Sequence, residues 1–259
     1  MIYVGVGGWV YEPWRDNFYP KGLPQKRELE YASQHLTAIE INGTYYGSQK
    51  PESFRKWRSE TPGGFVFSLK GPRFATNRRV LAEAGESITR FFDSGVTELK
   101  EKLGPINWQF MATKKFDAAD FAAFLKLLPR KVGGQAIRHV VEVRHDSFKD
   151  KAFIDLCRKE DVGIVFAADS EFPLIADVTT DFVYARIMGT SAKEKAGYPA
   201  AMLKTWAERA HDWEKGNSPK ASMLVVPAAP EKKRDVFLFV ISGAKEKNPA
   251  AAQAIIAAL

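Results

Sequence analysis

Eight short apolar runs recur along the chain, and segments with a helical pattern separate them. The runs are rich in Val, Ile, Phe and Tyr, which favours β-strands. The predicted strands cover residues 2–8, 37–42, 65–70, 106–111, 139–144, 162–167, 182–188 and 236–242. This alternation over 259 residues predicts a (β/α)8 TIM barrel of the α/β class. A doubly wound open sheet is the alternative, because periodicity cannot show that a sheet closes.

Helical periodicity appears after every predicted strand except the sixth. The predicted helices cover residues 26–35, 51–60, 88–103, 117–128, 150–160, 200–215 and 249–259. The segment 169–181 contains Pro173 and is too short for a proper helix. Gly133-Gly134 and residues 231–234 are predicted as loops. We therefore expect one single-domain barrel over residues 1–259, with an irregular sixth helix unit.

Composition favours an ordinary globular protein. Lys and Arg number 38 against 31 Asp and Glu, a formal charge of +7 that is spread along the chain and favours anionic partners only weakly. The single cysteine, Cys157, shares an apolar helix face with Phe153 and is expected to be a small buried side chain. No signal-peptide pattern and no apolar run of about 18 residues is present. We expect a cytoplasmic protein without a membrane segment.

Polar residues occupy alternate positions near the ends of five predicted strands. In a TIM barrel the active site lies at these ends, and residues of one parity point inward. The candidates are Glu40, Asn42, Ser68, Lys70, Gln109, Glu142, Arg144 and Arg186. Burying a charge costs several kcal/mol unless it is paired. These residues therefore form either a closed salt-bridge network or a substrate site, and the sequence leaves both readings open.

Three of these residues are candidates for catalysis. Glu40 and Glu142 lie on strands roughly across the barrel and could act as acid and base, or as nucleophile and acid in glycoside chemistry. Lys70 could form a Schiff base if nearby arginines lowered its pKa, but we expect the neighbouring carboxylates to raise that pKa. The expected substrate-binding residues are Asn42, Gln109, Arg144, Arg186, Trp9 and Tyr45.

Aromatic residues gather in the predicted loops after the first two strands. They are Trp9, Tyr11, Trp14, Phe18, Tyr19, Tyr45 and Tyr46. Such rings either stack on a sugar or a base, or pack the rim of the barrel. The glycine-rich turn from Gly5 to Gly8 lacks the dinucleotide-binding fingerprint, so we expect no organic cofactor. The four histidines lack metal-ligand spacing, so we expect no metal site, and a carboxylate-only magnesium site has no support.

Several motifs together resemble the YecE-like family, also called domain of unknown function 72. They are Gly5 to Trp9, Glu40-Ile41-Asn42-Gly43-Thr44-Tyr45-Tyr46, Lys70-Gly71-Pro72-Arg73, Gln109-Phe110, Glu142-Val143-Arg144-His145 and Tyr184-Ala185-Arg186. The resemblance implies a TIM barrel in a cytoplasmic, bacterial-type protein, and it supplies no reaction. The chain departs from the common family pattern at Val6, Gly7, Asn77, Met188, Ile241 and Ser242.

The sequence favours an enzyme that uses acid/base chemistry without an organic cofactor. Its substrate would be small and polar, either anionic or sugar-like, and would bind at the C-terminal mouth of the barrel. One alternative is a protein that binds or processes nucleic acid, suggested by the net charge and the loop aromatics. Another alternative is a noncatalytic ligand-binding barrel.

Overall fold

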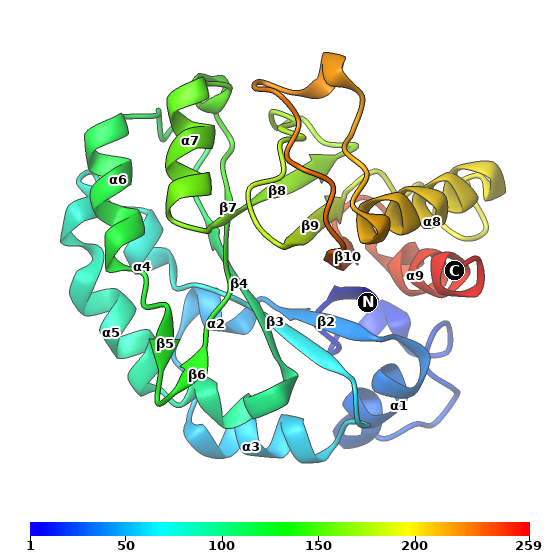
Figure 1. Cartoon of the computed structure of the whole chain (residues 1–259). Coiled ribbons are helices and arrows are strands. Elements are labelled where there is room, and N and C mark those ends of the chain that lie inside the picture. The colour runs from blue at the N-terminus through cyan, green and yellow to red at the C-terminus, as the bar shows by residue number, and fades with distance from the viewer.

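Eight parallel strands close into one barrel in the computed structural model, which describes residues 1–259 (Figure 1). The strand order is β1-β10-β9-β8-β7-β4-β3-β2, and β1 pairs with both β2 and β10. The predicted TIM barrel is therefore confirmed and the open sheet is excluded. The barrel strands are β1 Ile2–Gly7, β2 Ala38–Ile41, β3 Val66–Lys70, β4 Leu103–Gln109, β7 His139–Glu142, β8 Gly163–Ala168, β9 Phe182–Ile187 and β10 Asp235–Val240.

Helices surround the barrel on its outer side (Figure 1). They are α1 Glu28–His35, α2 Gly43–Tyr46, α3 Pro51–Ser59, α4 Arg73–Thr76, α5 Gly85–Asp93, α6 Ala118–Leu127, α7 Lys151–Lys159, α8 Ala200–Lys215 and α9 Asn248–Ala257. No helix lies between β8 and β9, so the irregular sixth unit is confirmed. None of these helices combines the length and the hydropathy that crossing a lipid bilayer requires.

Side-chain capping explains where two of the helices begin. The Asp117 carboxylate accepts a hydrogen bond of 3.0 Å from the Asp120 backbone N–H at the start of α6. Asp150 accepts from the Ala152 N–H at 2.7 Å at the start of α7. Both bonds satisfy backbone donors that have no partner within the helix. On α7, Cys157 is buried, as its position on the apolar face predicted.

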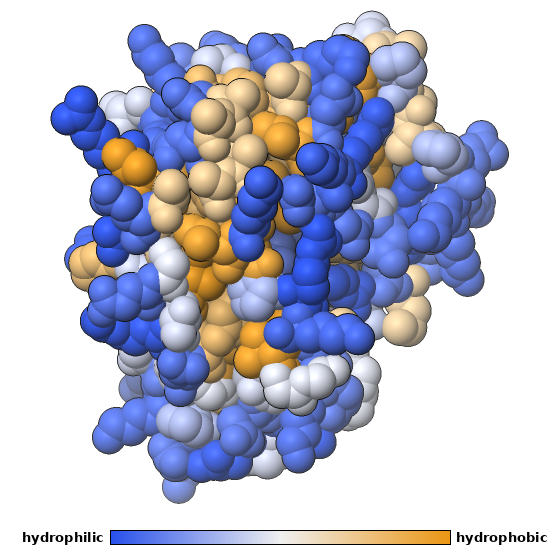
Figure 2. Space-filling view, turned by 60° about the vertical axis from the view of Figure 1, so that its left-hand side comes forward, coloured by the Kyte–Doolittle hydropathy of each residue, from blue (hydrophilic) through white to orange (hydrophobic).

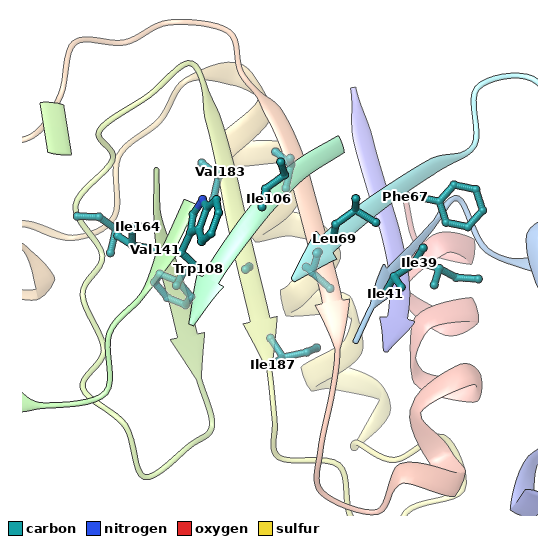
Figure 3. Close-up of a cluster of buried hydrophobic side chains, with 14 of the residues drawn as sticks. Ile39, Ile41, Phe67, Leu69, Ile106, Trp108, Val141, Ile164, Val183 and Ile187 are labelled. Atoms are coloured by element: carbon teal, nitrogen blue, oxygen red, sulfur yellow. The ribbon is translucent and has the colours of Figure 1, made fainter. Parts of the chain in front are cut away.

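Alternate strand residues form two apolar layers. One parity packs outward against the helices, as Figure 3 shows for Ile39, Ile41, Phe67, Leu69, Ile106, Trp108, Val141, Ile164, Val183 and Ile187. The other parity forms a separate cluster that includes Val66, Val140, Val165, Tyr184 and Phe237. Strands buried on both faces account for the nearly continuous apolar runs in the sequence. The polar residues of the site share the inward parity, nearer the C-terminal ends.

The predicted continuous helix over residues 88–103 is wrong. Helix α5 ends at Asp93, Gly95 adopts a left-handed conformation with φ of 94°, and a short helical turn leads into β4 at Leu103. A Cβ atom on Gly95 would lie 2.9 Å from Pro51. Apolar residues on both sides of the break are buried, so the helical pattern continued through it. The continuous spacing of apolar residues therefore concealed the break, and Gly95 was the sequence signal for it.

The predicted loop at Gly133-Gly134 is the turn of a small hairpin. Strands β5 (Lys131–Val132) and β6 (Gln135–Ala136) pair antiparallel outside the barrel. The two glycines have φ of 56° and 82°. A two-residue hairpin turn that needs positive φ at both positions favours Gly-Gly. The dipeptide was therefore a strand-pairing signal in the sequence.

A buried histidine ties β4 to β7 on the outer face of the barrel. The Trp108 indole N–H donates to His139 Nδ1 at 3.1 Å, and His139 Nε2 lies 2.9 Å from the Pro129 carbonyl oxygen. Nδ1 thus accepts and Nε2 carries the proton, which makes the ring neutral. Burial lowers the pKa of His139 from its ordinary value to about 4.

This neutral ring predicts a loss of stability in mild acid. Because the pKa of His139 is about 4 in the folded protein and about 6.5 when unfolded, the unfolded chain binds the proton first as pH falls. The free energy of unfolding is expected to drop by about 3 kcal/mol from this group between pH 6.5 and pH 4. Urea unfolding of the wild type and of His139→Gln measures it. An equally steep pH dependence in His139→Gln would contradict the assignment.

Candidate active site

Arg186 lies inside the barrel between two buried carboxylates. Its Nη2 lies 3.1 Å from Glu40 Oε1, and its Nη1 lies 2.5 Å from Glu142 Oε2. Both glutamates are fully buried, and Arg186 is 3% exposed. Strand parity places all three inward: Glu40 on β2, Glu142 on β7 and Arg186 on β9. One guanidinium therefore links three strands, none of which is a neighbour of another in the barrel.

Both carboxylates receive further hydrogen bonds. The Tyr184 hydroxyl donates to Glu40 Oε2 at 2.6 Å, and the Asn107 amide donates to Glu142 Oε2 at 3.2 Å. Arg144 donates through Nε and Nη2 to Glu142 Oε1 at 2.8 and 2.6 Å. Each carboxylate oxygen thus accepts at least one hydrogen bond. The two negative charges are fully compensated, as burial requires.

The charges around Glu142 keep it ionised. Burial alone would raise the pKa of Glu142, but Arg186, Arg144 and Lys70 outweigh burial and lower it to about 2. Burial also acts against the charged form of Arg186, yet Glu142 and Glu40 raise the pKa of its guanidinium above the ordinary value. Glu142 is therefore a fixed negative charge at neutral pH.

Lys70 differs from the other four charged residues at the strand ends because it has no ion pair. Its ammonium donates a hydrogen bond to Gln109 Oε1 and lies 4.6 Å from the centre of the Tyr45 ring. Burial and then Arg186 lower the pKa of Lys70 to about 8, although Glu40 and Glu142 act in the opposite direction. The carboxylates do raise this pKa, as expected, but burial and Arg186 outweigh them, so the net shift is downward.

Three donors at the barrel mouth have no hydrogen-bond partner within the protein. Arg144 bonds Glu142 through Nε and Nη2, which leaves Nη1 free, and Gln109 uses only its carbonyl oxygen. The half-buried Asn42 side chain makes no hydrogen bond, and a Cβ atom on Gly7 would lie 2.9 Å from its Nδ2. Glycine at position 7 therefore leaves space for this amide.

Most of the predicted loop aromatics pack rather than face solvent. Trp14 and Tyr19 are buried, and the Tyr19 hydroxyl donates to the Trp9 carbonyl at 2.5 Å. Trp9 is partly buried against Trp57, with ring centres 5.3 Å apart. The packing interpretation therefore describes the loop after β1. Tyr45 is half-buried over Lys70, and the next residue, Tyr46, is 65% exposed.

Sequence reasoning missed two members of the site, Tyr184 and Asn107. Each lies two residues before an identified residue, Arg186 and Gln109 respectively, and so shares its inward parity. That spacing was an available signal. Tyr184 also lies 2.8 Å from the Ser68 hydroxyl, so the network reaches β3. No three His, Cys, Asp or Glu side chains come together as a metal site would require.

Comparison with known proteins places this barrel in a family. A family model described as "Protein of unknown function DUF72" matches residues 3–259. The chain belongs to the DUF72 family. This membership confirms the resemblance seen in the sequence motifs, and the family description names no reaction.

Named relatives and solved structures agree with this assignment. The chain is 29% identical over 151 residues to UPF0759 protein YecE of Escherichia coli K12, covering 57% of this chain and 50% of YecE. It is 28% identical over 115 residues to UPF0759 protein YunF of Bacillus subtilis, covering 42% of this chain and 40% of YunF. The matches thus span half or less of the length of these two curated relatives. A DUF72 protein from Thermotoga maritima has the same fold, with a TM-score of 0.74 and 22% sequence identity. The match covers 99% of this chain and 98% of the Thermotoga maritima protein.

The buried ion pairs predict a large cost for removing Arg186. Arg186→Met leaves Glu40 and Glu142 buried without their shared cation, and we expect the free energy of unfolding to fall by about 3–5 kcal/mol. Urea unfolding measures this loss. The matched control is Arg90→Met, which breaks the exposed pair with Glu86 and should cost less than about 1 kcal/mol. Equal losses in the two variants would contradict a structural role for Arg186.

Proposed function

We propose that this DUF72 protein is an enzyme that transfers protons to and from a small, oxygen-rich substrate at the C-terminal mouth of the barrel. Lys70 is the acid/base group in this proposal. The observation that carries it is the isolation of this amine, which is almost buried, has no carboxylate partner and has a pKa of about 8. A group whose pKa lies near neutrality can both accept and return a proton at physiological pH.

The glutamates are less suited to this role than the lysine. Glu142 is fully buried, and its two oxygens already bond Arg186, Arg144 and Asn107. Its pKa of about 2 leaves almost no protonated form to act as an acid near pH 7. We therefore assign Glu142 and Glu40 to holding Arg186. This assignment replaces the proton-transfer roles that their positions suggested. Burial, and after it Arg186, lowers the pKa of Lys70.

The hydrogen-bond donors without a protein partner indicate which chemical groups the substrate carries. Arg144 Nη1, Gln109 Nε2 and the Asn42 amide have no protein partner, and a carboxylate, phosphate, carbonyl or sugar hydroxyl would satisfy them. The surplus of one positive charge among Lys70, Arg144, Arg186, Glu40 and Glu142 favours an anion. Tyr45 is proposed to line the place where the substrate binds, because its ring lies over Lys70, whereas Trp9 packs against Trp57.

The depressed pKa predicts unusual reactivity of the Lys70 amine. With a pKa of about 8, roughly a quarter of Lys70 is neutral at pH 7.5, against about 0.1% of an ordinary lysine. Labelling with limiting acetic anhydride from pH 6 to pH 11, read by peptide mass spectrometry, measures each titration. The exposed Lys159 is the internal control. If Lys70 titrates over the same pH range as Lys159, Lys70 is not the acid/base group.

Proton transfer itself is tested by solvent deuterium exchange. The protein is incubated in D₂O with keto acids, hydroxy acids and sugar phosphates, and NMR follows the loss of carbon-bound hydrogen. Lys70→Met is expected to slow exchange by about 10²–10⁴-fold. Its stability should hold because no ion pair is lost, and Lys159→Met should exchange at the wild-type rate. Equal exchange in Lys70→Met and the wild type, or no exchange of any compound by the wild type, would overturn the proposal.

A further inference from the structure

Exposed apolar side chains concentrate on one side of the barrel mouth. Tyr46 is 65% exposed and Phe74 is 60% exposed, and Val10, Val80 and Met111 are exposed as well. All five follow β1, β2, β3 or β4, which are consecutive in the barrel. The other two large exposed apolar residues are at the chain ends. An apolar group of this kind at a functional rim marks a binding surface more often than scattered residues do.

An unpaired arginine lies within about 6 Å of the centres of both exposed rings. The Arg73 guanidinium is 5.9 Å from the centre of the Tyr46 ring and 5.4 Å from that of Phe74. Arg73 is exposed and makes no ion pair or hydrogen bond through its side chain. We call Tyr46, Arg73, Phe74, Arg78 and Arg79 the rim patch. Two exposed rings close to an unpaired guanidinium can provide both base stacking and a positive charge.

The loops around the rim patch are basic. Residues 71–84 and 110–117 hold five Arg or Lys (Arg73, Arg78, Arg79, Lys114, Lys115) against two acids (Glu83, Asp117), a net charge of +3. These 22 residues thus carry a large part of the formal +7 of the chain. Lys114 is ion-paired with Asp120, just outside these loops, so part of this positive charge is neutralised.

A hollow of about 240 Å³ adjoins the rim patch. Phe74 and Arg78 line it, and most of its other lining residues are polar, among them Thr44, Ser48, Gln49 and Ser87. Arg78 is held in place, because it donates to the Phe74 carbonyl at 2.8 Å and to the Ser87 hydroxyl at 3.1 Å. On the side of the molecule that carries α4, α5 and α6, Figure 2 shows apolar surface bordered by hydrophilic residues.

We propose that the rim patch binds single-stranded nucleic acid, with bases stacked on Tyr46 and Phe74 and phosphates bound by Arg73 and Arg79. Sequence-tolerant binding of single strands requires a basic surface with exposed aromatic rings, and both are present. A membrane surface would favour a continuous apolar face, whereas here charged residues separate the rings. The inference goes beyond the proposed function and uses neither Lys70 nor the donors around it.

The test measures the binding of a fluorescent 12-nucleotide DNA strand by anisotropy, from about 20 mM to 200 mM salt. The wild type should bind and weaken steeply as salt rises. Tyr46→Ala/Phe74→Ala should weaken binding by about tenfold or more at fixed salt, because stacking is lost. Arg73→Gln/Arg79→Gln should reduce the slope of log K against log salt by about 1.4, because two phosphate contacts are lost.

Two controls separate this site from general attraction to the basic protein. Lys159→Gln removes one exposed charge from the last turn of α7, which lies at the opposite end of the barrel, and should leave binding unchanged. An abasic strand of equal length and charge should bind the wild type as weakly as the intact strand binds Tyr46→Ala/Phe74→Ala. Lys70→Met should bind the strand normally, which separates this inference from the proposed enzyme.

Several outcomes would overturn the inference. One is the absence of binding at low salt. Another is equal affinity of the wild type and Tyr46→Ala/Phe74→Ala, which would show attraction by charge alone. Tighter binding of an acidic peptide or an anionic lipid vesicle than of the strand, lost in the same double variant, would assign the rim patch to that partner instead.

Discussion

The position of Arg186 between Glu40 and Glu142 is the interaction on which the rest of the mouth depends. A guanidinium inside a closed barrel has no access to water, so its charge persists only because two carboxylates face it. The same carboxylates are then unavailable to Lys70, which remains a weakly basic amine. Glu142 also holds Arg144, whose guanidinium lies 4.2 Å from the centre of the Phe172 ring. One buried ion triad thus sets both the charge and the geometry of its neighbours.

The mouth contains two chemically different levels. At the deeper level Glu40, Glu142, Arg186 and Tyr184 bond one another, and all four carboxylate oxygens accept hydrogen bonds, although Arg186 Nε has no partner. The shallower level retains unused donors on Arg144, Gln109 and Asn42. The two interpretations that the sequence left open, a salt-bridge network and a substrate site, therefore describe different levels of one structure. The first matches the deeper level, and the second remains our proposal for the shallower one.

The barrel could be predicted from the sequence because each strand is marked by the residues of its own short segment. Apolar runs and their spacing located all eight strands, and inward parity selected Glu40, Glu142 and Arg186. Which charged side chains form ion pairs was not local information. It depends on the relative positions of the strands around the barrel. The sequence therefore does not say that Arg186 rather than Lys70 contacts both carboxylates. The helix break at Gly95 was hidden for another reason. Apolar residues on both sides of the break are buried in the same core, so the helical pattern of apolar residues continues across it.

One short helix brings the inner and outer surfaces of the mouth together. The Thr44 hydroxyl donates to the Lys70 carbonyl at 2.7 Å and so fixes α2 to the end of β3. On that single turn, Tyr45 covers the Lys70 ammonium, while Tyr46 faces solvent with its ring centre 5.1 Å from that of Tyr45. A single helical turn therefore carries both the ring that covers the buried amine and the ring that is exposed at the rim.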